Sequence, residues 1–416
     1  MSTIEPVTQT IKLPVAVAQP LSLRLFKQLS LRKILLKLHL YISLWFGAML
    51  SLAGLTGSLL VYENGLDKWL NSELMTVAPG DSRLPYSALL AAANTATPIK
   101  VPAAYMLLPE EPDDVLIVRY AVPMSEAEHA EHAKKGGMMH RHHFHEVMVN
   151  PYTGQVIGDR DKHDSLMSII LRLHFKLLVD DTGKLIMGIT ALLALVLTIT
   201  GIYLWWPKLG KIKQAFLIKP NASFTRFNFD LHKTVGIYTA LVMLSVCLSG
   251  VYFNLPEIFK PAVNWFSPID EAPMRIMSLP TGDQPISPDQ AIARALATFP
   301  DLRPQRVNLP EDPYGSYSVS GRQPGELRHK GATRIWLDQY SGAVIQRRDP
   351  ERFNPGTAFI NLQLPLHNGE ILGEIGRVLV LIAGLAPLIL TVTGTIHWLK
   401  KRRSKRLHRQ RELRAG

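Results

Sequence analysis

Four stretches of the chain contain no Asp, Glu, Lys or Arg, and they constrain its fold more than any other feature. They cover residues 38–62, 185–207, 234–256 and 378–399. Each exceeds the roughly 18–20 apolar residues that a helix needs to cross about 30 Å of hydrocarbon. Buried helices of soluble proteins are rarely this long and uncharged. The first stretch is also too long for a signal peptide, and no small-residue cleavage site follows it. We therefore predict four transmembrane helices, over residues 33–62, 185–207, 232–256 and 372–399.

The positive charges are concentrated at the ends of these stretches. The net charge is +12, and basic residues cluster at 24–37, 208–226 and 400–406, whereas the two long connections mix both signs. This clustering beside apolar stretches argues against a nucleic-acid-binding surface. The positive-inside rule predicts that the tails 1–32 and 400–416 and the loop 208–231 are cytoplasmic. Segments 63–184 and 257–371 would then lie in the periplasm of a bacterium, with the protein in the inner membrane.

The chain matches itself at a constant shift of 193 residues. The matched positions are spread over both halves: Leu38-His39 with Leu231-His232, Gly57 with Gly250, Leu173-His174 with Leu366-His367, Thr200-Gly201 with Thr393-Gly394, and Trp205 with Trp398. One shift that holds over so many positions indicates a tandem duplication. Because each copy contains two spans, both copies keep the same orientation, and a pseudo-two-fold axis along the membrane normal should relate them.

Both external segments carry the same order of local patterns. A helical pattern comes first, at 86–95 and at 288–299, and Ser287 is a suitable N-cap for the second. Alternating apolar segments follow, and each copy then has a strand–turn–strand pattern with a glycine in the turn, at 149–157 and 337–345. We predict two small α+β domains, each with one helix on an antiparallel sheet.

Four of the matched residues are histidines at the ends of the predicted spans. His39 and His232 lie near the cytoplasmic face, and His174 and His367 near the periplasmic face. A two-fold axis would place each pair side by side, and two neutral imidazoles can supply both axial ligands of a haem iron. The two levels are on the order of 25–30 Å apart at about 1.5 Å per helical residue, so one haem cannot bridge them and two are implied. Alternatively, each histidine is interfacial and is satisfied by lipid headgroups or backbone carbonyls.

Other histidines do not follow the repeat. His397 aligns with Leu204, and we interpret it as a side chain that extends to the cytoplasmic boundary. The first external domain also has a His/Met-rich insertion, made of His129, His132, Met138, Met139, His140, His142, His143 and His145. We predict that His140, His142, His143 and His145 bind copper, iron or zinc. Their spacing lacks the geometry of a closed zinc site, so a flexible polar insertion is the alternative.

Several motifs resemble the PepSY-associated transmembrane family. They are the Leu-His starts of spans one and three, the later Leu173-His174 and Leu366-His367, the Thr-Gly-x-x-x-Trp ends of spans two and four, and the two external turns, which look like PepSY domains. The resemblance covers roughly residues 30–405. It implies an iron-regulated inner-membrane protein related to haem-containing reductases that release iron from ferric siderophores. It also implies that His39, His174, His232 and His367 bind two haem b groups. The insertion and His397 depart from the family pattern.

The function hypothesis is transmembrane electron transfer to a periplasmic ferric siderophore or other ferric complex. No nucleotide-binding Gly-x-Gly-x-x-Gly motif follows a predicted strand, so a membrane quinol or a separate cytoplasmic reductase would be the electron donor. No catalytic side chain is assigned beyond the haem ligands. Two alternatives stay open: a non-enzymatic PepSY membrane protein that binds or regulates a periplasmic partner, and a metal-uptake accessory protein or transporter.

Overall fold

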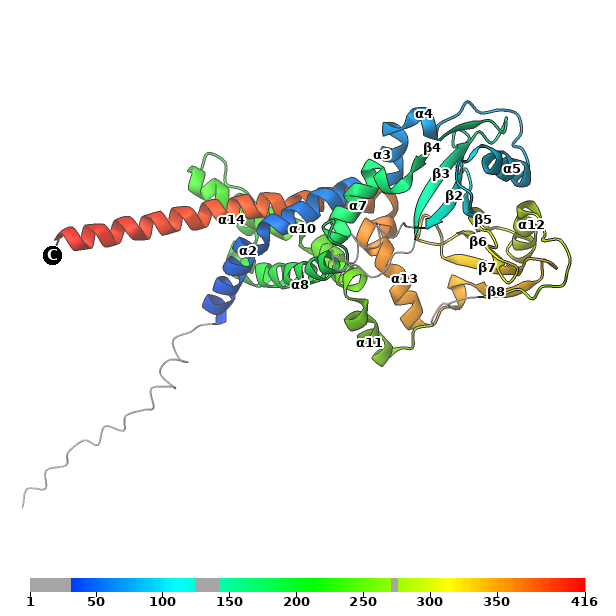
Figure 1. Cartoon of the computed structure of the whole chain (residues 1–416). Helices are drawn as coiled ribbons and strands as arrows, with labels where there is room; N and C mark the ends of the chain where they lie inside the picture. The colour runs from blue at the N-terminus through cyan, green and yellow to red at the C-terminus, as the bar shows by residue number, and fades with distance from the viewer. Residues whose placement is uncertain (1–30, 124–141, 271–275, 416) are drawn as a thin grey trace, which may run out of the picture.

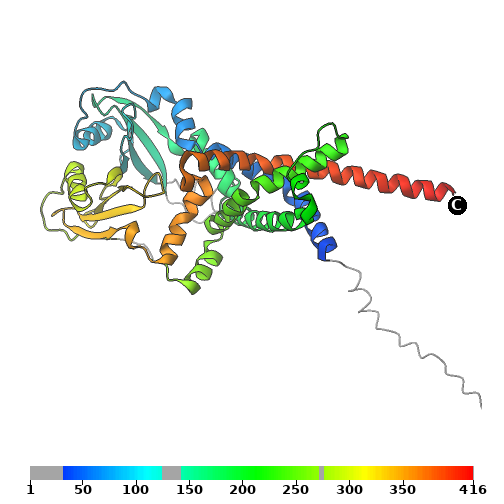
Figure 2. The ribbon, with the colours of Figure 1, turned by 180° about the vertical axis from the view of Figure 1, so that it is seen from behind.

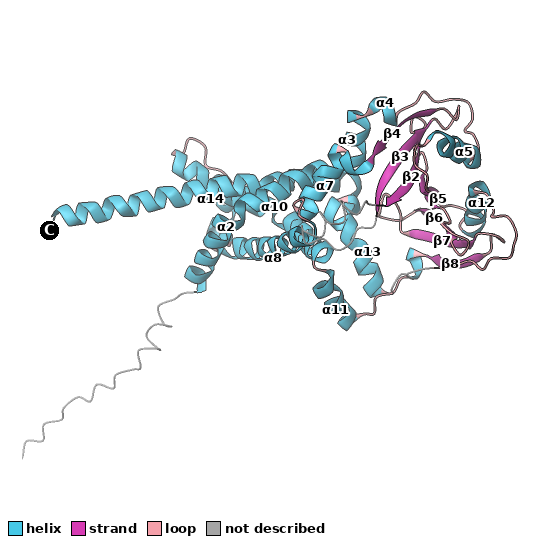
Figure 3. Ribbon diagram, viewed as in Figure 1, coloured by secondary structure: helices cyan, strands magenta, loops and turns pink. Residues whose placement is uncertain are grey.

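The molecule consists of a helical bundle and a β-sheet region at one end of it (Figures 1 and 3). A computed structural model describes residues 31–123, 142–270 and 276–415. In both views of the ribbon, the sheet lies beyond one end of the bundle, while the C-terminal helix points the opposite way (Figures 1 and 2).

Four helices form the bundle and correspond to the four uncharged stretches. They are α2 (Leu31–Leu60), α8 (Asp180–Trp205), α10 (Phe224–Asn254) and α14 (Gly373–Ala415). By length and composition each can cross a membrane. Many of their apolar side chains are exposed on the surface of the bundle. Such a surface is unfavourable in contact with water and favourable in contact with the hydrocarbon of a membrane. The prediction of four apolar spanning helices is confirmed. Helix α14 continues past its apolar part into a basic segment.

Shorter helices connect the bundle to the sheet. Two of them, α7 (Leu166–Lys176) and α13 (Pro355–Asn368), carry His174 and His367. Ser165 caps the start of α7, and Asn354 caps the start of α13. Gly369 (φ 86°) ends α13 in the left-handed conformation that glycine adopts at low cost. The other short elements on this side are α3 (Glu63–Leu70), α4 (Ser72–Met75), η1 (Lys162–Asp164), α11 (Pro256–Phe266), η3 (Pro350–Arg352) and η4 (Glu370–Leu372). Two more, η2 (Leu209–Lys211) and α9 (Ile212–Ala215), lie in the connection between α8 and α10.

The strands form one antiparallel sheet of eight strands in the order β4-β3-β2-β1-β5-β6-β7-β8. The join between the two four-stranded halves is the pairing of β1 with β5, where Met106 lies opposite Val307. The sequence predicted two small α+β domains, and the structure adds that their sheets are continuous. The strands are β1 (Ala103–Leu107), β2 (Leu116–Pro123), β3 (His142–Val149), β4 (Val156–Asp161), β5 (Arg303–Asn308), β6 (Ser316–Arg322), β7 (Thr333–Asp338) and β8 (Val344–Arg348).

Two helices cover one face of this sheet. Helices α5 (Tyr86–Ala96) and α12 (Pro288–Thr298) lie on the side away from the bundle (Figure 1). Both match the predicted helices, and Ser287 forms a capping box with Gln290 at the start of α12. Side chains of both halves share one apolar core beneath the two helices. Because strand side chains alternate between faces, the residues between the core positions point toward the bundle.

Candidate functional site

The four repeat-matched histidines lie in two groups. His174 on α7 and His367 on α13 form the sheet-side pair, with ring centroids 6.1 Å apart and ring planes at 63°. His39 on α2 and His232 on α10 lie toward the other end of the bundle, and we call them the far-end pair. The structure thus brings His174 and His367 together, as predicted from the repeat.

Each far-end histidine is oriented by a threonine on a neighbouring helix. His39 Nδ1 lies 3.0 Å from Thr200 Oγ1, and His232 Nδ1 lies 2.9 Å from Thr393 Oγ1. Both threonine hydroxyls donate their hydrogen to a carbonyl of their own helix, at 2.8 Å and 2.6 Å. A hydroxyl has one hydrogen to donate, so each threonine oxygen accepts from the histidine. Both rings therefore carry their hydrogen on Nδ1.

The sheet-side histidines have the same tautomer for a stronger reason. His174 Nδ1 lies 3.0 Å from the carbonyl oxygen of Ala53, and His367 Nδ1 lies 3.1 Å from that of Val246. A carbonyl oxygen only accepts hydrogen bonds, so Nδ1 must be the donor. Thr56 and Ser249 place a hydroxyl oxygen at 3.0 Å and 2.9 Å from the same nitrogens. In all four histidines the lone pair of Nε2 is therefore available to a ligand.

A glycine lies against each of the four rings. A Cβ atom placed on Gly57 or Gly394 would be 3.0 or 3.3 Å from Cε1 of the histidine, which is tighter than ordinary contact. On Gly201 or Gly250 it would be 3.4 or 3.7 Å away, an ordinary van der Waals distance. The contacts join Gly57 to His174, Gly250 to His367, Gly201 to His39 and Gly394 to His232. The ring, its hydroxyl partner and its glycine recur at the shift of 193 residues in both groups.

The spacing of His174 and His367 is that of two residues that could together hold one haem iron. The porphyrin supplies four iron ligands, so two imidazoles complete the set. An iron–nitrogen bond of about 2 Å, extended by about 1 Å to the ring centre, places two axial rings roughly 6 Å apart, close to the 6.1 Å between His174 and His367. Hydrogen bonding through the second ring nitrogen is the arrangement that metal-binding histidines adopt. In the described part of the chain, no three His, Cys, Asp or Glu side chains are grouped to hold a bare metal ion.

His397 lacks these features. Its side chain is exposed, and its ring packs on Phe229 with centroids 5.8 Å apart. No hydroxyl partner or glycine contact of the kind that orients the other four is found for it among the described residues. This environment agrees with a histidine at the boundary of the bundle.

The predicted metal ligands of the insertion are only partly described. His140 lies outside the described residues, as do His129, His132, Met138 and Met139. Strand β3 places His143 and His145 on one face, with Nε2 atoms 3.1 Å from Asp161 and 2.9 Å from Asp159. Strand alternation puts His142 on the opposite face. The described histidines do not converge on one point, and a metal site in the insertion stays a prediction.

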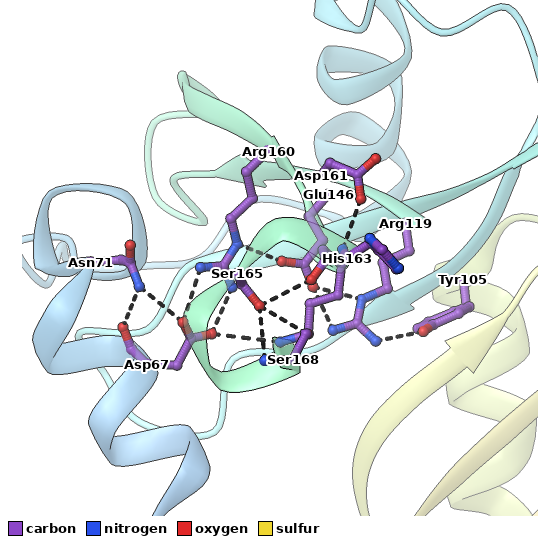
Figure 4. A network of polar contacts seen from close by, with 11 residues as sticks. Asp67, Asn71, Tyr105, Arg119, Glu146, Arg160, Asp161, His163, Ser165 and Ser168 are labelled. Carbon is purple, nitrogen blue, oxygen red and sulfur yellow. Dashed lines mark hydrogen bonds and ion pairs between the residues drawn. The ribbon is translucent and has the colours of Figure 1, made fainter. Parts of the chain in front are cut away.

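A buried ionic network ties the first half of the sheet to α3 (Figure 4). Glu146 is fully buried and bonds Arg119 at 2.5 Å and Arg160 at 2.7 Å. Arg160 in turn makes two hydrogen bonds to Asp67 of α3, at 3.0 and 2.6 Å. Burial alone would raise the pKa of Asp67, but the bonds from Arg160 hold it below its usual value. Every charge in the network has a partner, as a buried ionic group requires.

Four apolar helices and an attached antiparallel sheet define a multi-pass membrane protein with an extramembrane α+β region. The model of the PepSY-associated TM region matches residues 36–401. The chain therefore belongs to the PepSY-associated transmembrane family, as the resemblance of its motifs suggested. A search among curated proteins gave no match.

The sequence alone did not reveal the groups that orient the histidines on the sheet side. Thr56 and Ser249 precede the matched glycines Gly57 and Gly250 directly, and both carry a hydroxyl. A comparison of side-chain chemistry instead of residue identity at the shift of 193 would have found them.

Proposed function

We propose that this protein is a di-haem b-type electron-transfer protein of the bacterial inner membrane that reduces ferric siderophores or other ferric complexes in the periplasm. The observation that supports it most is the orientation of His39, His174, His232 and His367. Each donates from Nδ1 to a hydroxyl or carbonyl oxygen and leaves Nε2 free. An interfacial histidine satisfied by lipid would not need the same two contacts four times.

The proposal includes a tandem duplication and a defined orientation in the membrane. The recurrence of every histidine contact at the shift of 193 supports two copies of one two-helix unit. Basic residues before and at the start of α2, between α8 and α10, and in the C-terminal part of α14 support cytoplasmic termini. The sheet then lies in the periplasm, on the side where His174 and His367 are held.

In this function the histidines hold and position the cofactors, while the sheet region receives the ferric complex. Bound haem supplies a one-electron carrier at each end of the bundle. A quinol or a separate cytoplasmic reductase would serve the far-end pair. Reduction of Fe(III) to Fe(II) weakens its binding by hard oxygen chelators, so iron leaves the siderophore.

An absorption spectrum of the purified protein tests this proposal. Bis-histidine haem gives a Soret band and, after reduction with dithionite, sharp α and β bands. Anaerobic addition of a ferric chelate should return the spectrum to the oxidised form. A colourless protein, after expression with sufficient haem, would exclude the reductase and favour a PepSY membrane protein that binds a periplasmic partner.

A further inference from the structure

The two halves of the sheet differ in charge at equivalent positions on the face that points toward the bundle. In the first half, one row across the strands consists of Tyr105, Arg119, Glu146 and Arg160, which lie opposite one another in register. Glu146 neutralises the two arginines, and Asp67 adds a second carboxylate. All charged side chains of this row are paired with one another or with Asp67, so the row has no unpaired charge that could bind a ligand.

The corresponding row of the second half has lost its carboxylate. Strand register places Arg306 opposite Ser320, Ser320 opposite Arg334 and Arg334 opposite Arg348. The turn sequences 149–157 and 337–345 align at a shift of 188, which makes Arg334 the counterpart of Glu146. The central acid of the first row is therefore an arginine in the second.

The three arginines on the strands of this row form no ion pair with a carboxylate within the described residues. No ion pair involves Arg306, Arg334 or Arg348 there. Like charges directly opposite on neighbouring strands are destabilising, and Arg334 faces Arg348 in this way. Burial lowers the pKa of Arg334, and the charges of Arg348 and Arg328 lower it further. The fold keeps an unfavourable arrangement that a bound anion would relieve.

Arg328 extends the row toward the bundle. Its Nη1 donates to Asn361 of α13 at 3.1 Å, and its Nε is buried without a hydrogen-bond partner in the described structure. Asn361 precedes His367 by six residues (361 to 367), or about 9 Å along the helix. Helix α13 lies on the bundle side of the sheet in both views (Figures 1 and 2). The row thus borders the helix that presents a sheet-side histidine.

Space and flat apolar surfaces adjoin the arginines. The guanidinium of Arg306 stacks on Tyr105 at 3.6 Å from the ring centroid, and Arg334 lies 5.6 Å from the ring of Trp336. Beside Arg306 lies a cavity of about 540 Å³, which Tyr105 and Phe144 also border, with the carboxylates Glu311 and Asp312 in its wall. The other arginines of the second half do not line this cavity. Cavities of this size hold small-molecule ligands, and planar guanidinium groups match carboxylate oxygens in pairs.

We infer that the arginine row, made of Arg306, Arg328, Arg334 and Arg348, is a binding site for a small polyanion. The ligand class is a ferric chelate with free carboxylate or catecholate oxygens, in contrast to neutral or cationic ferric hydroxamates. The iron in this assignment depends on the proposed function, whereas the anion site itself does not. Arg334 lies in register between Ser320 and Arg348, so removing its charge should weaken binding of such a ligand.

Binding of gallium(III) citrate to the full-length protein in detergent tests the site. Gallium(III) is not reduced under these conditions, so binding is measured independently of electron transfer. Isothermal titration should give a Kd at least tenfold higher for Arg334→Gln than for the unaltered protein. Arg347→Gln is the matched control, because Arg347 is exposed, lies on the same strand as Arg348 and points to the opposite face. Its Kd should not change.

A second measurement connects the site to reduction. Dithionite-reduced Arg334→Gln should be reoxidised more slowly by ferric citrate, and at an unchanged rate by a neutral ferric tris-hydroxamate. An unchanged spectrum and unchanged haem content show that the variant is folded.

The inference is overturned if gallium citrate does not bind, if Arg334→Gln binds it as well as the Arg347→Gln control, or if the row binds only vesicles of anionic lipid. A colourless protein that still binds gallium citrate through Arg334 would instead remove the reductase function and leave the anion site standing.

Discussion

At the residue scale, the contacts of the ring, and not only the position along the bundle, distinguish a candidate haem ligand from another histidine. His39 and His397 both lie toward the end of the bundle away from the sheet, yet only His39 has a threonine at Nδ1 and a glycine at Cε1. The threonine selects the tautomer, and the glycine sets how closely the ring can approach its neighbouring helix. These two contacts explain why the Thr-Gly pair recurs at 200–201 and 393–394.

The hydrogen bond that His39 Nδ1 donates to Thr200 should therefore contribute to haem affinity. Thr200→Val removes the acceptor but keeps the shape, so the Nδ1 hydrogen of His39 loses its partner. Loss of such an outer partner typically costs about 10- to 100-fold in metal affinity. Haem titration into the apoprotein should show this loss at one of the two sites.

Thr198→Val provides the control for this change. The hydroxyl of Thr198 donates to the carbonyl of Ala194 on its own helix, and within the described structure it makes no hydrogen bond to a histidine. Haem affinity should be unchanged in this variant. Equal weakening by both substitutions would mean that the helix, and not the histidine, responds to the loss of a hydroxyl.

The histidines themselves could be predicted because identical residues mark them in both copies. The arginine row could not, because its members lie on three strands and on the loop between β6 and β7, and only the folded sheet brings them together. In the sequence these arginines look like ordinary surface residues of strands. Nothing in their local sequence distinguishes Arg306, Arg334 and Arg348 from Arg347. The pairing of Arg334 with Arg348 also depends on a register shift in the β7–β8 ladder, which lies between this pair and the turn.

At the element scale, the two helices on the sheet depend on each other. Ser287 caps α12, but Pro85 offers α5 no side-chain cap. Asp289 of α12 accepts hydrogen bonds from the backbone nitrogens of Tyr86 and Ser87, at 2.7 and 2.9 Å. A carboxylate at a helix N-terminus also interacts favourably with the helix dipole. Helix α12 of the second half thus caps α5 of the first.

Asp289→Ala should therefore loosen α5 specifically. Loss of an N-cap interaction costs about 1 kcal/mol, within a range of roughly 0.5–2. Hydrogen–deuterium exchange of residues 86–96 should show a matching fall in the free energy of local opening. Asp301→Ala, at an exposed position between α12 and β5, should leave this exchange unchanged.

The same contact predicts a dependence on pH. Burial would raise the pKa of Asp289, but hydrogen bonds from Ser87 and Tyr86 hold it below its usual value. A group whose pKa is depressed on folding stabilises the protein above its unfolded pKa, about 4, and loses that effect as the pH falls through the folded value. The difference between Asp289→Ala and the unaltered protein should thus be full at pH 7 and shrink below pH 4.

The sequence pattern could not predict that the two half-sheets join, because this too depends on which strands meet in the folded protein. The pattern predicted a helix and an antiparallel sheet in each half, and both are present. Which edge strand meets which is decided by the whole fold, because any exposed edge offers unpaired backbone groups. The approach of α5 to α12 depends on that same pairing of β1 with β5.

At the scale of the whole molecule, the two histidine pairs occupy opposite ends of one bundle. On α2, His39 and Gly57, the glycine beneath His174, are separated by 18 residues (39 to 57), or about 27 Å. No residue is shared between the contacts of the two ends. The proposed haem sites should therefore fill independently.

Single histidine substitutions test that independence. His39→Ala and His174→Ala should each lower the haem content to about half of the unaltered value, because each removes an axial ligand from one site only. The double variant should be nearly free of haem, whereas His397→Ala, which lies outside both sets of contacts, should keep the full content. Pyridine haemochrome assays against protein concentration give these ratios directly. If either single substitution abolished all haem, the bundle would hold one cooperative centre, and electron transfer over its full length would need a different explanation.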